Sequence, residues 1–246
     1  MKTRLRLLKT DWRDAELNLA LEWAMLELMR AGSLPNVLRL WTNEPCVVID
    51  RSGKALAEVR LGTCEALGIP VLKRPTTGGA VYHDEGNLNW TIVMEKAGRY
   101  GFRWPSELEQ RASHAILQLI KALGLEGRYE ARRGVFVRGR KISGIAMYIG
   151  QRAILVHGTL LVCSDLSALR GALKCKYEVA SLSELTRSAL DPWADVAPLL
   201  AEELARAFGA YVVEGRLSRE ELALAEELRP MARARAAWIS SELKNR

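Results

Sequence analysis

The residues best suited to bind an anion surround a glycine pair, Gly78-Gly79, a few positions after Arg74. Because glycine has no side chain, such a pair lets backbone N–H groups approach an anionic ligand closely. The guanidinium of Arg74 can add a forked, charge-assisted contact to a phosphate or a carboxylate. A plain glycine turn between two strands is the alternative, and the G-x-x-x-x-G-K-[ST] pattern of a P-loop is absent from the sequence. The segment therefore indicates either an anion-binding loop or a structural turn.

A lysine and a histidine in two later apolar segments are the next candidates. Lys141 follows the turn-like sequence Arg138-Gly139-Arg140 and precedes an apolar strand. A lysine at this position can project inward and place its ammonium group as a point charge on a phosphate or a carbonyl. An exposed surface hairpin is the alternative. His157 lies within a β-rich apolar run, where a hydrogen-bonded core histidine is the usual outcome. Neither residue alone defines a site.

The cysteines and histidines do not form a metal-binding pattern. Cys46, Cys64, Cys163 and Cys175 are widely spaced and include no C-x-x-C pair, and the chain has only three histidines. A zinc site is therefore not expected. Four cysteines in a chain of this size do not make a disulfide framework, so we expect reduced thiols in an intracellular protein.

The composition predicts a soluble globular protein. The chain has 246 residues, 49% hydrophobic and 26% charged, which suits one large domain or two small ones and argues against disorder. No apolar run approaches the ~18 residues of a membrane helix, and charges interrupt the N-terminus before a signal-peptide core develops, so a cytoplasmic location is expected. The net charge of +7 would suit a nucleotide, a nucleic acid or an acidic protein. The basic cluster within 132–141 lacks the interleaved aromatic residues of a nucleic-acid platform, which argues against nucleic acid.

Hydrophobic periodicity and turn residues predict the elements that must position these candidates. Helices are expected from Asp11, as the N-cap, to about Met29, and over 55–67, 106–123, 165–173, 192–208 and 218–228, with a charged helical tail over 231–243. Strands are expected over 37–41, 46–49, 71–73, 88–93, 135–137, 141–149, 153–162 and 211–213, with 135–162 forming a sheet of hairpins. Because strands and helices are segregated rather than strictly alternating, the pattern predicts an α+β fold with a mixed or antiparallel β-sheet flanked by helices.

Three segments, in this order, resemble the lipoate–protein ligase A family, within the biotin/lipoate A/B ligase and octanoyltransferase superfamily. Residues 73–89 are similar to its motif R-R-x-[ST]-G-G-G-A-V-[YF]-H-D-x-G-N-L-N, residues 139–144 to G-[RK]-K-I-S-G, and residues 157–161 to H-G-T-L-L. The resemblance extends over nearly the whole chain. It implies a catalytic domain like those of biotin ligases and class II aminoacyl-tRNA synthetases. It also implies that residues 1–246 form a single domain, the family's large domain, without its C-terminal accessory domain.

The resemblance further implies a two-step reaction with ATP, Mg²⁺ and lipoate. Lipoate and ATP would form lipoyl-adenylate and pyrophosphate, and the acyl group would then pass to a lysine of a lipoyl domain. The expected acceptors are the lipoyl domains of 2-oxoacid dehydrogenase complexes or the glycine cleavage H protein. No bound prosthetic group and no metal-ligating residues are implied, and neither a nucleic acid nor a membrane is an expected partner.

Residue roles carried over from the family by position fall into three groups. Those that would hold the nucleotide are Arg74, Gly79, Ala80, Val81, Tyr82 and Lys141, and those that would contact lipoate are Gly78, His83, His157 and Lys141. Lys141 would therefore touch both ligands, stabilise the negative charge that accumulates at the α-phosphorus, and polarise the mixed anhydride for the acceptor amine. His83 and Asp84 are expected to brace the loop rather than to transfer protons.

Several positions depart from the family pattern. Thr77 replaces the first glycine of a triplet, and Ile145 and Met147 stand where Ser and Gln often follow the lysine motif. Arg133-Gly134 replaces an Asn-Asp pair whose carboxylate could help to hold magnesium, and the stretch after Asp165 is shorter than the family's adenylate-binding loop. Unaided adenylation is therefore in doubt, and we expect a separate accessory subunit to support it.

A cysteine acyltransferase of the octanoyltransferase type, which uses the same fold without ATP, is the main alternative. Those enzymes pair a lysine with a cysteine that lies ten residues after an Asp-Leu, and Asp165-Leu166 is followed at that distance by Cys175. Cys175 and Lys141 would then be the catalytic pair, although Lys174 and Lys176 replace the proline and glycine that flank the cysteine in that family. A biotin ligase is disfavoured because its arginine- and glycine-rich loop is not found. A non-catalytic binding module is disfavoured because Arg74, Gly78-Gly79 and Lys141 are intact.

Overall fold

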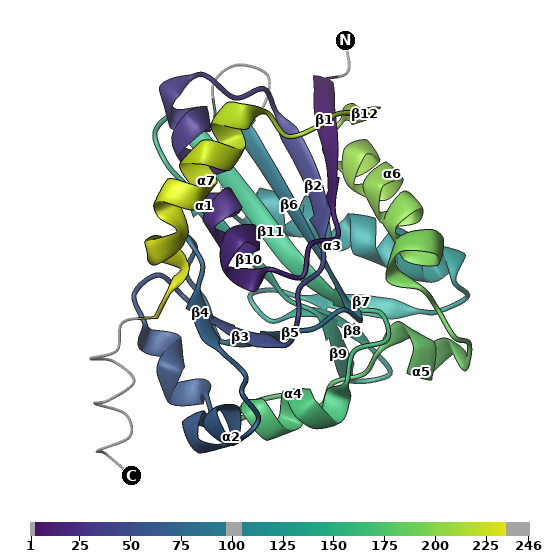
Figure 1. Cartoon of the computed structure of the whole chain (residues 1–246). Coiled ribbons are helices and arrows are strands. Elements are labelled where there is room, and N and C mark those ends of the chain that lie inside the picture. The colour runs from purple at the N-terminus through teal and green to yellow at the C-terminus, as the bar shows by residue number, and fades with distance from the viewer. Residues whose placement is uncertain (1–2, 97–104, 235–246) are drawn as a thin grey trace.

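The computed structural model describes residues 3–96 and 105–234, and its centre is a six-stranded sheet in the order β10-β11-β6-β2-β1-β12 (Figure 1). The strands are β1 (Thr3–Thr10), β2 (Val37–Trp41), β6 (Asn87–Glu95), β10 (Ile145–Ile149), β11 (Ala153–Leu161) and β12 (Ala210–Glu214). Strand β1 runs parallel to its neighbours β2 and β12, whereas the pairs β2–β6, β6–β11 and β11–β10 are antiparallel. The predicted mixed sheet is therefore confirmed.

Two pairs of helices cover the two faces of this sheet (Figure 1). Helices α1 (Ala15–Ala31) and α7 (Arg219–Ala232) pack against each other on one face, and α3 (Pro105–Ala122) and α6 (Ala197–Ala207) pack together on the other. Because side chains alternate along a strand, β2 contributes Leu38 and Leu40 to the α3–α6 side. The same strand contributes Val37 and Trp41 to the α1–α7 side. The central strands are therefore buried on both faces.

The ends of α1 are fixed by its capping residues. The carboxylate of Asp14 accepts a hydrogen bond from the backbone N–H of Leu17, so the N-cap is Asp14 and the predicted cap at Asp11 is wrong. Gly32 ends the helix in the left-handed conformation, with φ of 78°. Between these ends the helix buries Glu22 completely, which places a carboxylate between the helix and the central sheet.

Two three-stranded sheets lie below the central sheet in Figure 1 and carry the glycine segment and Lys141, whereas His157 lies on β11 of the central sheet. The first has the order β4-β3-β5, from β3 (Cys46–Ile49), β4 (Val71–Lys73) and β5 (Val81–His83). The second is formed by β7 (Gly127–Glu130), β8 (Gly134–Val137) and β9 (Arg140–Ser143). The short helices are η1 (Lys54–Glu58), α2 (Leu61–Ala66), α4 (Leu166–Ala172) and α5 (Leu182–Thr186). A separate apolar cluster packs η1, α2 and α4 against the first small sheet.

The α+β class is confirmed, but several predicted elements differ from the structure. The sequence pattern does not predict β1, β5, β7 or α5. The predicted helix over 55–67 is divided into η1 and α2, because Val59 between them forms a β-bridge with Leu173. The predicted strand over 141–149 breaks at Gly144, so that β9 joins a small sheet and β10 the central sheet. The expected single sheet of hairpins is therefore wrong.

The last helices also differ from their predicted ranges. The helix expected over 192–208 begins with a π-helical turn, η3 (Pro192–Val196), before α6. Helix α7 extends to Ala232, beyond the predicted end near Leu228, although Pro230 lies inside it. Ion pairs from Arg229 to Asp14 and from Arg233 to Glu16 hold its last turns beside the start of α1. Residues 235–243 of the predicted helical tail lie outside the described residues.

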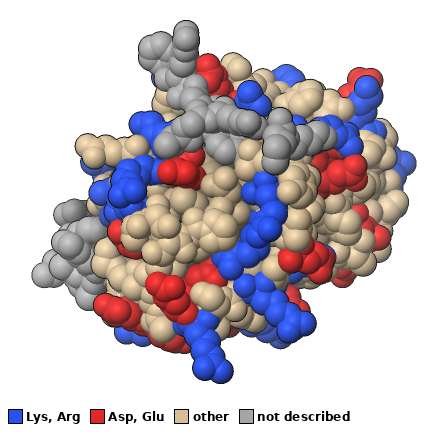
Figure 2. All heavy atoms as spheres, turned by 90° about the horizontal axis from the view of Figure 1, so that it is seen from above, with Lys and Arg blue, Asp and Glu red and all other residues tan. Residues whose placement is uncertain are grey.

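The surface carries both signs of charge. On the face drawn in Figure 2, Lys and Arg side chains are interspersed with Asp and Glu side chains, apart from one continuous basic run near the middle. The excess positive charge is therefore distributed over this face rather than separated from the acidic residues. Within the described ranges, every helix is too short or too polar to cross a membrane.

Candidate active site

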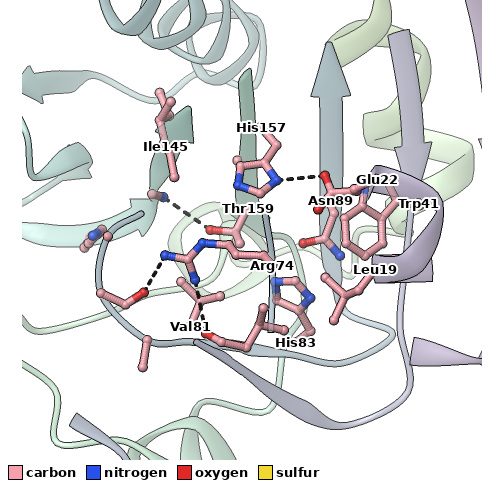
Figure 3. A pocket seen from close by; sticks show the side chains of 18 of the residues that line it. Leu19, Glu22, Trp41, Arg74, Val81, His83, Asn89, Ile145, His157 and Thr159 are labelled. Carbon is pink, nitrogen blue, oxygen red and sulfur yellow. Dashed lines mark hydrogen bonds and ion pairs between the residues drawn. The ribbon is translucent and has the colours of Figure 1, made fainter. Parts of the chain in front are cut away.

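The three predicted motifs meet at two adjoining cavities, the first of which is shown in Figure 3. The first cavity has a volume of about 160 Å³ and the second of about 260 Å³. The residues that line both are Gly79, Ala80, Val81, Arg132, Arg133, Lys141, Gly144 and Thr159. The glycine segment and Lys141 thus form the shared wall, where a ligand that extends from one cavity to the other would pass.

The glycine loop joins β4 to β5. Gly78 has φ of 118°, a conformation that residues with a side chain rarely adopt, so the turn requires glycine there. The backbone of Gly79 is not restricted in this way, but a Cβ atom on it would lie 2.7 Å from Oε2 of Glu58. The first glycine therefore shapes the loop, and the second admits a carboxylate close to the backbone.

Arg74 holds this loop from inside. Its guanidinium donates to Oγ1 of Thr76 at 2.9 Å and to the carbonyl oxygens of Val48 at 3.2 Å, Thr77 at 3.2 Å and Gly79 at 2.8 Å. Burial lowers the pKa of Arg74 to about 10, which leaves it a cation at neutral pH. Because most of its N–H donors are engaged within the loop, Arg74 positions the glycine pair, and its contact with a nucleotide stays a prediction.

A buried hydrogen-bonded chain connects α1 and the central sheet to this loop. Nδ1 of His157 lies 2.7 Å from Oε1 of Glu22 (Figure 3), and Oγ1 of Thr91 donates to the same oxygen at 2.6 Å. Burial opposes the charge on Glu22, but His157, Thr91 and Arg39 outweigh it and hold the pKa of Glu22 below its usual range. Glu22 is therefore an ionised carboxylate inside the molecule.

The contacts of His157 define the orientation of its ring. A carboxylate only accepts hydrogen bonds, so Nδ1 of His157 carries the proton that faces Glu22. On the other side of the ring, Nε2 lies 2.7 Å from Oγ1 of Thr76, which already accepts from Nε of Arg74. The Thr76 hydroxyl can therefore donate to Nε2. His157 therefore links Glu22 to the glycine loop.

His83 and Asp84, at the end of β5, make structural contacts. Nδ1 of His83 lies 3.1 Å from Nδ2 of Asn43, and its ring meets the edge of Trp41 with centroids 5.6 Å apart. Burial lowers the pKa of His83 to about 3, so its imidazole is neutral at physiological pH. The carboxylate of Asp84 accepts from the backbone N–H of Asp165 at 2.8 Å, which ties β5 to the start of α4.

The first cavity combines an apolar wall with buried polar atoms. Leu19, Trp41, Val81 and Ile145 contribute apolar surface (Figure 3). Oε2 of Glu22 and Nδ2 of Asn89, from the same lining, are buried without a hydrogen-bond partner among the described residues. Because a buried polar atom without a partner is unfavourable, these two atoms favour a ligand or water in the cavity.

Lys141 reaches the shared wall from β9. Its backbone N–H donates to the carbonyl of Glu178 at 2.7 Å, and its carbonyl accepts from Ala180 at 3.1 Å. Its ammonium lies 5.4 Å from the ring centroid of Tyr177. Burial lowers the pKa of Lys141, while the nearby carboxylate of Glu58 favours its charged form. Lys141 is thus a partly buried cation that faces both cavities.

The charged residues that line the second cavity are mainly cations. Its charged lining residues are Arg132, Arg133, Lys141, Lys174, Lys176 and one acid, Glu58. Tyr82, which the family resemblance places at the nucleotide, also lines the second cavity, although it is almost fully buried. Such a cluster of positive charge in a hollow favours an anionic, phosphorylated ligand.

Cys175, the alternative nucleophile, lines the second cavity together with Lys141. The residue is exposed, but partial burial of its thiol raises its pKa despite the opposing effect of Arg170 and Arg60. A raised pKa leaves little thiolate at neutral pH. The structure therefore brings the proposed pair to one cavity without activating the sulfur.

The described residues do not form a protein-only magnesium site. No group of three or more His, Cys, Asp or Glu side chains is placed to hold a metal in residues 3–96 and 105–234. The second cavity offers the single carboxylate of Glu58. Mg²⁺ commonly binds through one or two carboxylates and substrate phosphates, so an ion here would depend on the phosphates of a bound nucleotide.

Every residue predicted for the site lines one of the two cavities, but sequence reasoning missed three others: Glu22, Glu58 and Tyr177. Glu22 has a readable signal, because a charged residue lies within the Leu-rich stretch of a predicted helix and buried charges are normally paired. Glu58 and Tyr177 lie in no recognisable motif. Only the fold brings them beside Lys141.

Comparison with known proteins gives a consistent result. Residues 14–205 match the family model described as the lipoyl protein ligase A/B catalytic domain. A protein of Aeropyrum pernix assigned by name to lipoate-protein ligase A is 32% identical over 236 residues, covering 90% of this chain and 87% of its own length. A Mycoplasma pneumoniae relative of the same kind is 30% identical over 62% of this chain, but the match spans only 44% of that longer protein.

Solved structures match over nearly the whole chain. A Thermoplasma acidophilum protein with bound lipoic acid, assigned as a lipoate protein ligase, has a TM-score of 0.78 and 26% identity, covering 97% of this chain and 99% of its own. A lipoate-protein ligase A bound with ATP has the same score and identity, with coverages of 94% and 95%. A bi-partite archaeal ligase studied with its E2 lipoyl domain, also from Thermoplasma acidophilum, has a TM-score of 0.77 and 26% identity, with coverages of 94% and 92%.

Proposed function

Because the chain belongs to the lipoyl protein ligase A/B catalytic domain family, we propose that it activates lipoate with ATP and transfers the lipoyl group to a lysine of a lipoyl domain. One observation carries the proposal. Lys141 lies on the wall shared by the first cavity, whose apolar wall suits an acyl chain, and the second cavity, whose mainly cationic charged residues suit a nucleotide. An acid and a nucleotide bound in these cavities would meet beside its ammonium group.

The first half-reaction assigns a role to each side of the shared wall. The lipoate carboxylate attacks the α-phosphorus of ATP, the bond to the pyrophosphate oxygen breaks, and lipoyl-adenylate forms. Negative charge accumulates on the phosphorus oxygens during the attack, and the Lys141 ammonium with the backbone N–H groups of the glycine loop would stabilise it. Arg74, through its contacts with the loop carbonyls, keeps those N–H groups in place. Mg²⁺, when bound with the phosphates, would supply further positive charge.

The second half-reaction uses the same cation. The acceptor lysine, as a free amine, attacks the lipoyl carbonyl of the mixed anhydride, an amide bond forms and AMP leaves with the bonding electron pair. Lys141 would polarise that carbonyl. His83 and His157 line the acyl cavity, and His83, whose imidazole is neutral at physiological pH, contributes to its shape.

We also propose that the chain acts as one catalytic domain assisted by a separate accessory subunit. The similarity to the ligase of a bi-partite archaeal system, over 92% of that chain, supports this arrangement. The replacement of the family's Asn-Asp pair by Arg133-Gly134 supports it too, because the chain lacks the carboxylate that could help to hold magnesium. The acceptor would be a lipoyl domain of a 2-oxoacid dehydrogenase complex or the glycine cleavage H protein.

An acyl-transfer assay on a purified lipoyl domain tests the proposal. The mass of the domain is followed with lipoate in the presence and absence of ATP, and separately with presynthesised lipoyl-adenylate. We expect modification with ATP only when the accessory subunit is added, and modification with lipoyl-adenylate by the chain alone. Failure with lipoyl-adenylate would contradict the ligase assignment, and rapid ATP-dependent transfer by the chain alone would contradict the accessory subunit.

The alternative function, an ATP-independent acyl transfer through Cys175 and Lys141, rests on their position in one cavity. It predicts transfer from an octanoyl or lipoyl thioester donor without ATP and loss of that transfer in Cys175→Ala. The same assay with a thioester donor therefore separates the two functions.

A further inference from the structure

An acidic side chain occupies the position in the second cavity where an anionic ligand would be expected. Oε2 of Glu58 accepts a hydrogen bond from the backbone N–H of Ala80 at 2.9 Å. Oε1 of the same carboxylate accepts from the ammonium of Lys176 at 2.5 Å. Ala80 directly follows the glycine pair, so Glu58 uses a backbone donor that the glycine loop would otherwise offer to a ligand.

The glycine pair allows this close approach. A Cβ atom at Gly79 would lie 2.7 Å from Oε2 of Glu58, which means that the carboxylate packs directly on the backbone of the loop. Among the described residues that line the second cavity, Glu58 is also the only acid, and five of the others are cations. It therefore neutralises part of the charge that would attract a phosphate.

The same glutamate joins two segments that are far apart in the sequence. Its carbonyl accepts from the backbone N–H of Lys174 at 2.7 Å, and the ammonium of Lys174 donates to the carbonyl of Ala57 at 2.8 Å. These backbone contacts do not involve the Glu58 carboxylate. Loss of the carboxylate alone therefore leaves the attachment of this segment to η1 in place while it releases Ala80 and Lys176.

We propose that the Ala80 N–H and the Lys176 ammonium form a phosphate subsite, and that Glu58 occupies this subsite until the nucleotide displaces it. The inference rests on the proposed function and adds two residues that set the affinity for the nucleotide. Binding then requires one exchange of anions: the phosphate replaces the carboxylate on the same two donors. Glu58 lowers the affinity, and Lys176 raises it.

ATP binding by isothermal titration calorimetry tests the opposite signs of these effects. A hydrogen bond to a charged group is worth about a tenfold change or more in an equilibrium constant. We therefore expect Glu58→Ala to bind ATP about tenfold more tightly than the wild type, Glu58→Gln to show a smaller gain, and Lys176→Ala to bind about tenfold more weakly. Glu65→Gln is the control, because Glu65 is an exposed acid on the neighbouring α2 and lines neither cavity. Thermal unfolding of each variant establishes that it is folded.

The outcomes separate this inference from the proposed function. Tight ATP binding by the wild type with unchanged or weaker binding by both Glu58 variants would overturn the inference and leave the proposed function intact. Binding by Glu58→Ala but not by the wild type would support the inference in its strongest form. Absence of ATP binding in the wild type and in all variants would overturn both.

Discussion

Replacement of the buried carboxylate of Glu22 provides a direct test of the network behind the acyl cavity. Glu22→Gln keeps the size of the side chain and removes its charge. The amide oxygen can still accept from Thr91, but the contact with Nδ1 of His157 loses the charge of the carboxylate. The position of Oε2, which has no partner among the described residues, would receive an NH₂ group with no acceptor.

The size of the effect follows from these losses. Removal of one charged partner from a buried pair costs about 3–5 kcal/mol, and a buried donor without an acceptor costs about 1–3 kcal/mol. Because the amide keeps part of the hydrogen bonding, we expect the free energy of unfolding to fall by about 3 kcal/mol. Arg39 contributes to this loss, since burial lowers its pKa to about 9 and the charge of Glu22 offsets that effect.

Urea denaturation at neutral pH measures the change, and Glu27→Gln on the same helix is the matched control. Glu27 is only partly buried and pairs with Arg30 at 2.6 Å, an arrangement that contributes about 0.5 kcal/mol. If Glu22→Gln destabilises the protein by less than about 1 kcal/mol, or no more than the control does, the network does not carry the stability assigned to it.

The same variant changes the response to acid. The pKa of Glu22 is lower in the folded protein than in the unfolded chain, where it is about 4.3. Its contribution to stability is therefore complete above that value and is lost as the pH falls through the folded pKa. The difference in unfolding free energy between the wild type and Glu22→Gln should accordingly shrink below about pH 4. A difference independent of pH would mean that the charge of Glu22 is not responsible.

Further substitutions test the site residues. Lys141→Ala should lower the rate of transfer from lipoyl-adenylate by about 10²–10³-fold. Lys141→Arg should be similarly impaired, because a forked guanidinium does not replace a point charge. Near-normal rates in either variant would refute the proposed role of Lys141 in polarising the lipoyl carbonyl. Gly78→Ala places a side chain on a backbone with φ of 118° and should cost about 1–3 kcal/mol of stability, measured by denaturation. It should also raise the KM for ATP in steady-state kinetics. An unchanged KM would mean that the glycine loop does not bind the nucleotide. The pKa of His83 is lowered to about 3, so between about pH 6.5 and pH 3 its imidazole is protonated only in the unfolded chain, and the free energy of unfolding should fall as the pH falls through this range. His83→Asn should flatten this part of the stability profile. An unaltered slope would contradict the lowered pKa assigned to His83. Cys175→Ala should leave ATP-dependent lipoylation within about twofold of the wild type, and a loss of an order of magnitude would instead favour the cysteine mechanism.

The sequence predicts most of the fold because its elements carry local signals. The apolar face of α1 and the β-rich run of β11 are long enough to be identified by their periodicity, and the capping box at Ser218 and Glu221 is present at the start of α7. Strand β1 is different, because the alternation of Arg4, Leu5, Arg6 and Leu7 is short and Leu8 interrupts it. That strand is recognisable only once β2 and β12 pair on both sides of it.

The site is predictable in part for the same reason. Lys141, the glycine loop and the two histidines belong to contiguous motifs, so sequence comparison alone brings them together. Glu58 and Lys176 are more than a hundred positions apart in the chain, and their contact depends on the β-bridge between Val59 and Leu173. No local pattern of charge or hydrophobicity encodes such a pairing, which is why the structure was needed to find it.

The break at Gly144 separates residues that line the second cavity from residues that line the first. On its N-terminal side, Ile142 and Ser143 of β9 line the cavity assigned to the nucleotide, and on its C-terminal side, Ile145 and Ala146 of β10 line the cavity assigned to the acyl chain. Because β9 and β10 belong to different sheets, each half is held in register by its own hydrogen-bonded neighbours. Substitutions in β10 can therefore diversify the range of acids accepted without redesign of the strand that carries Lys141. For directed evolution, a small library of substitutions at Ile145 and Ala146 would vary the first cavity and leave the residues of β9 that line the second cavity unchanged.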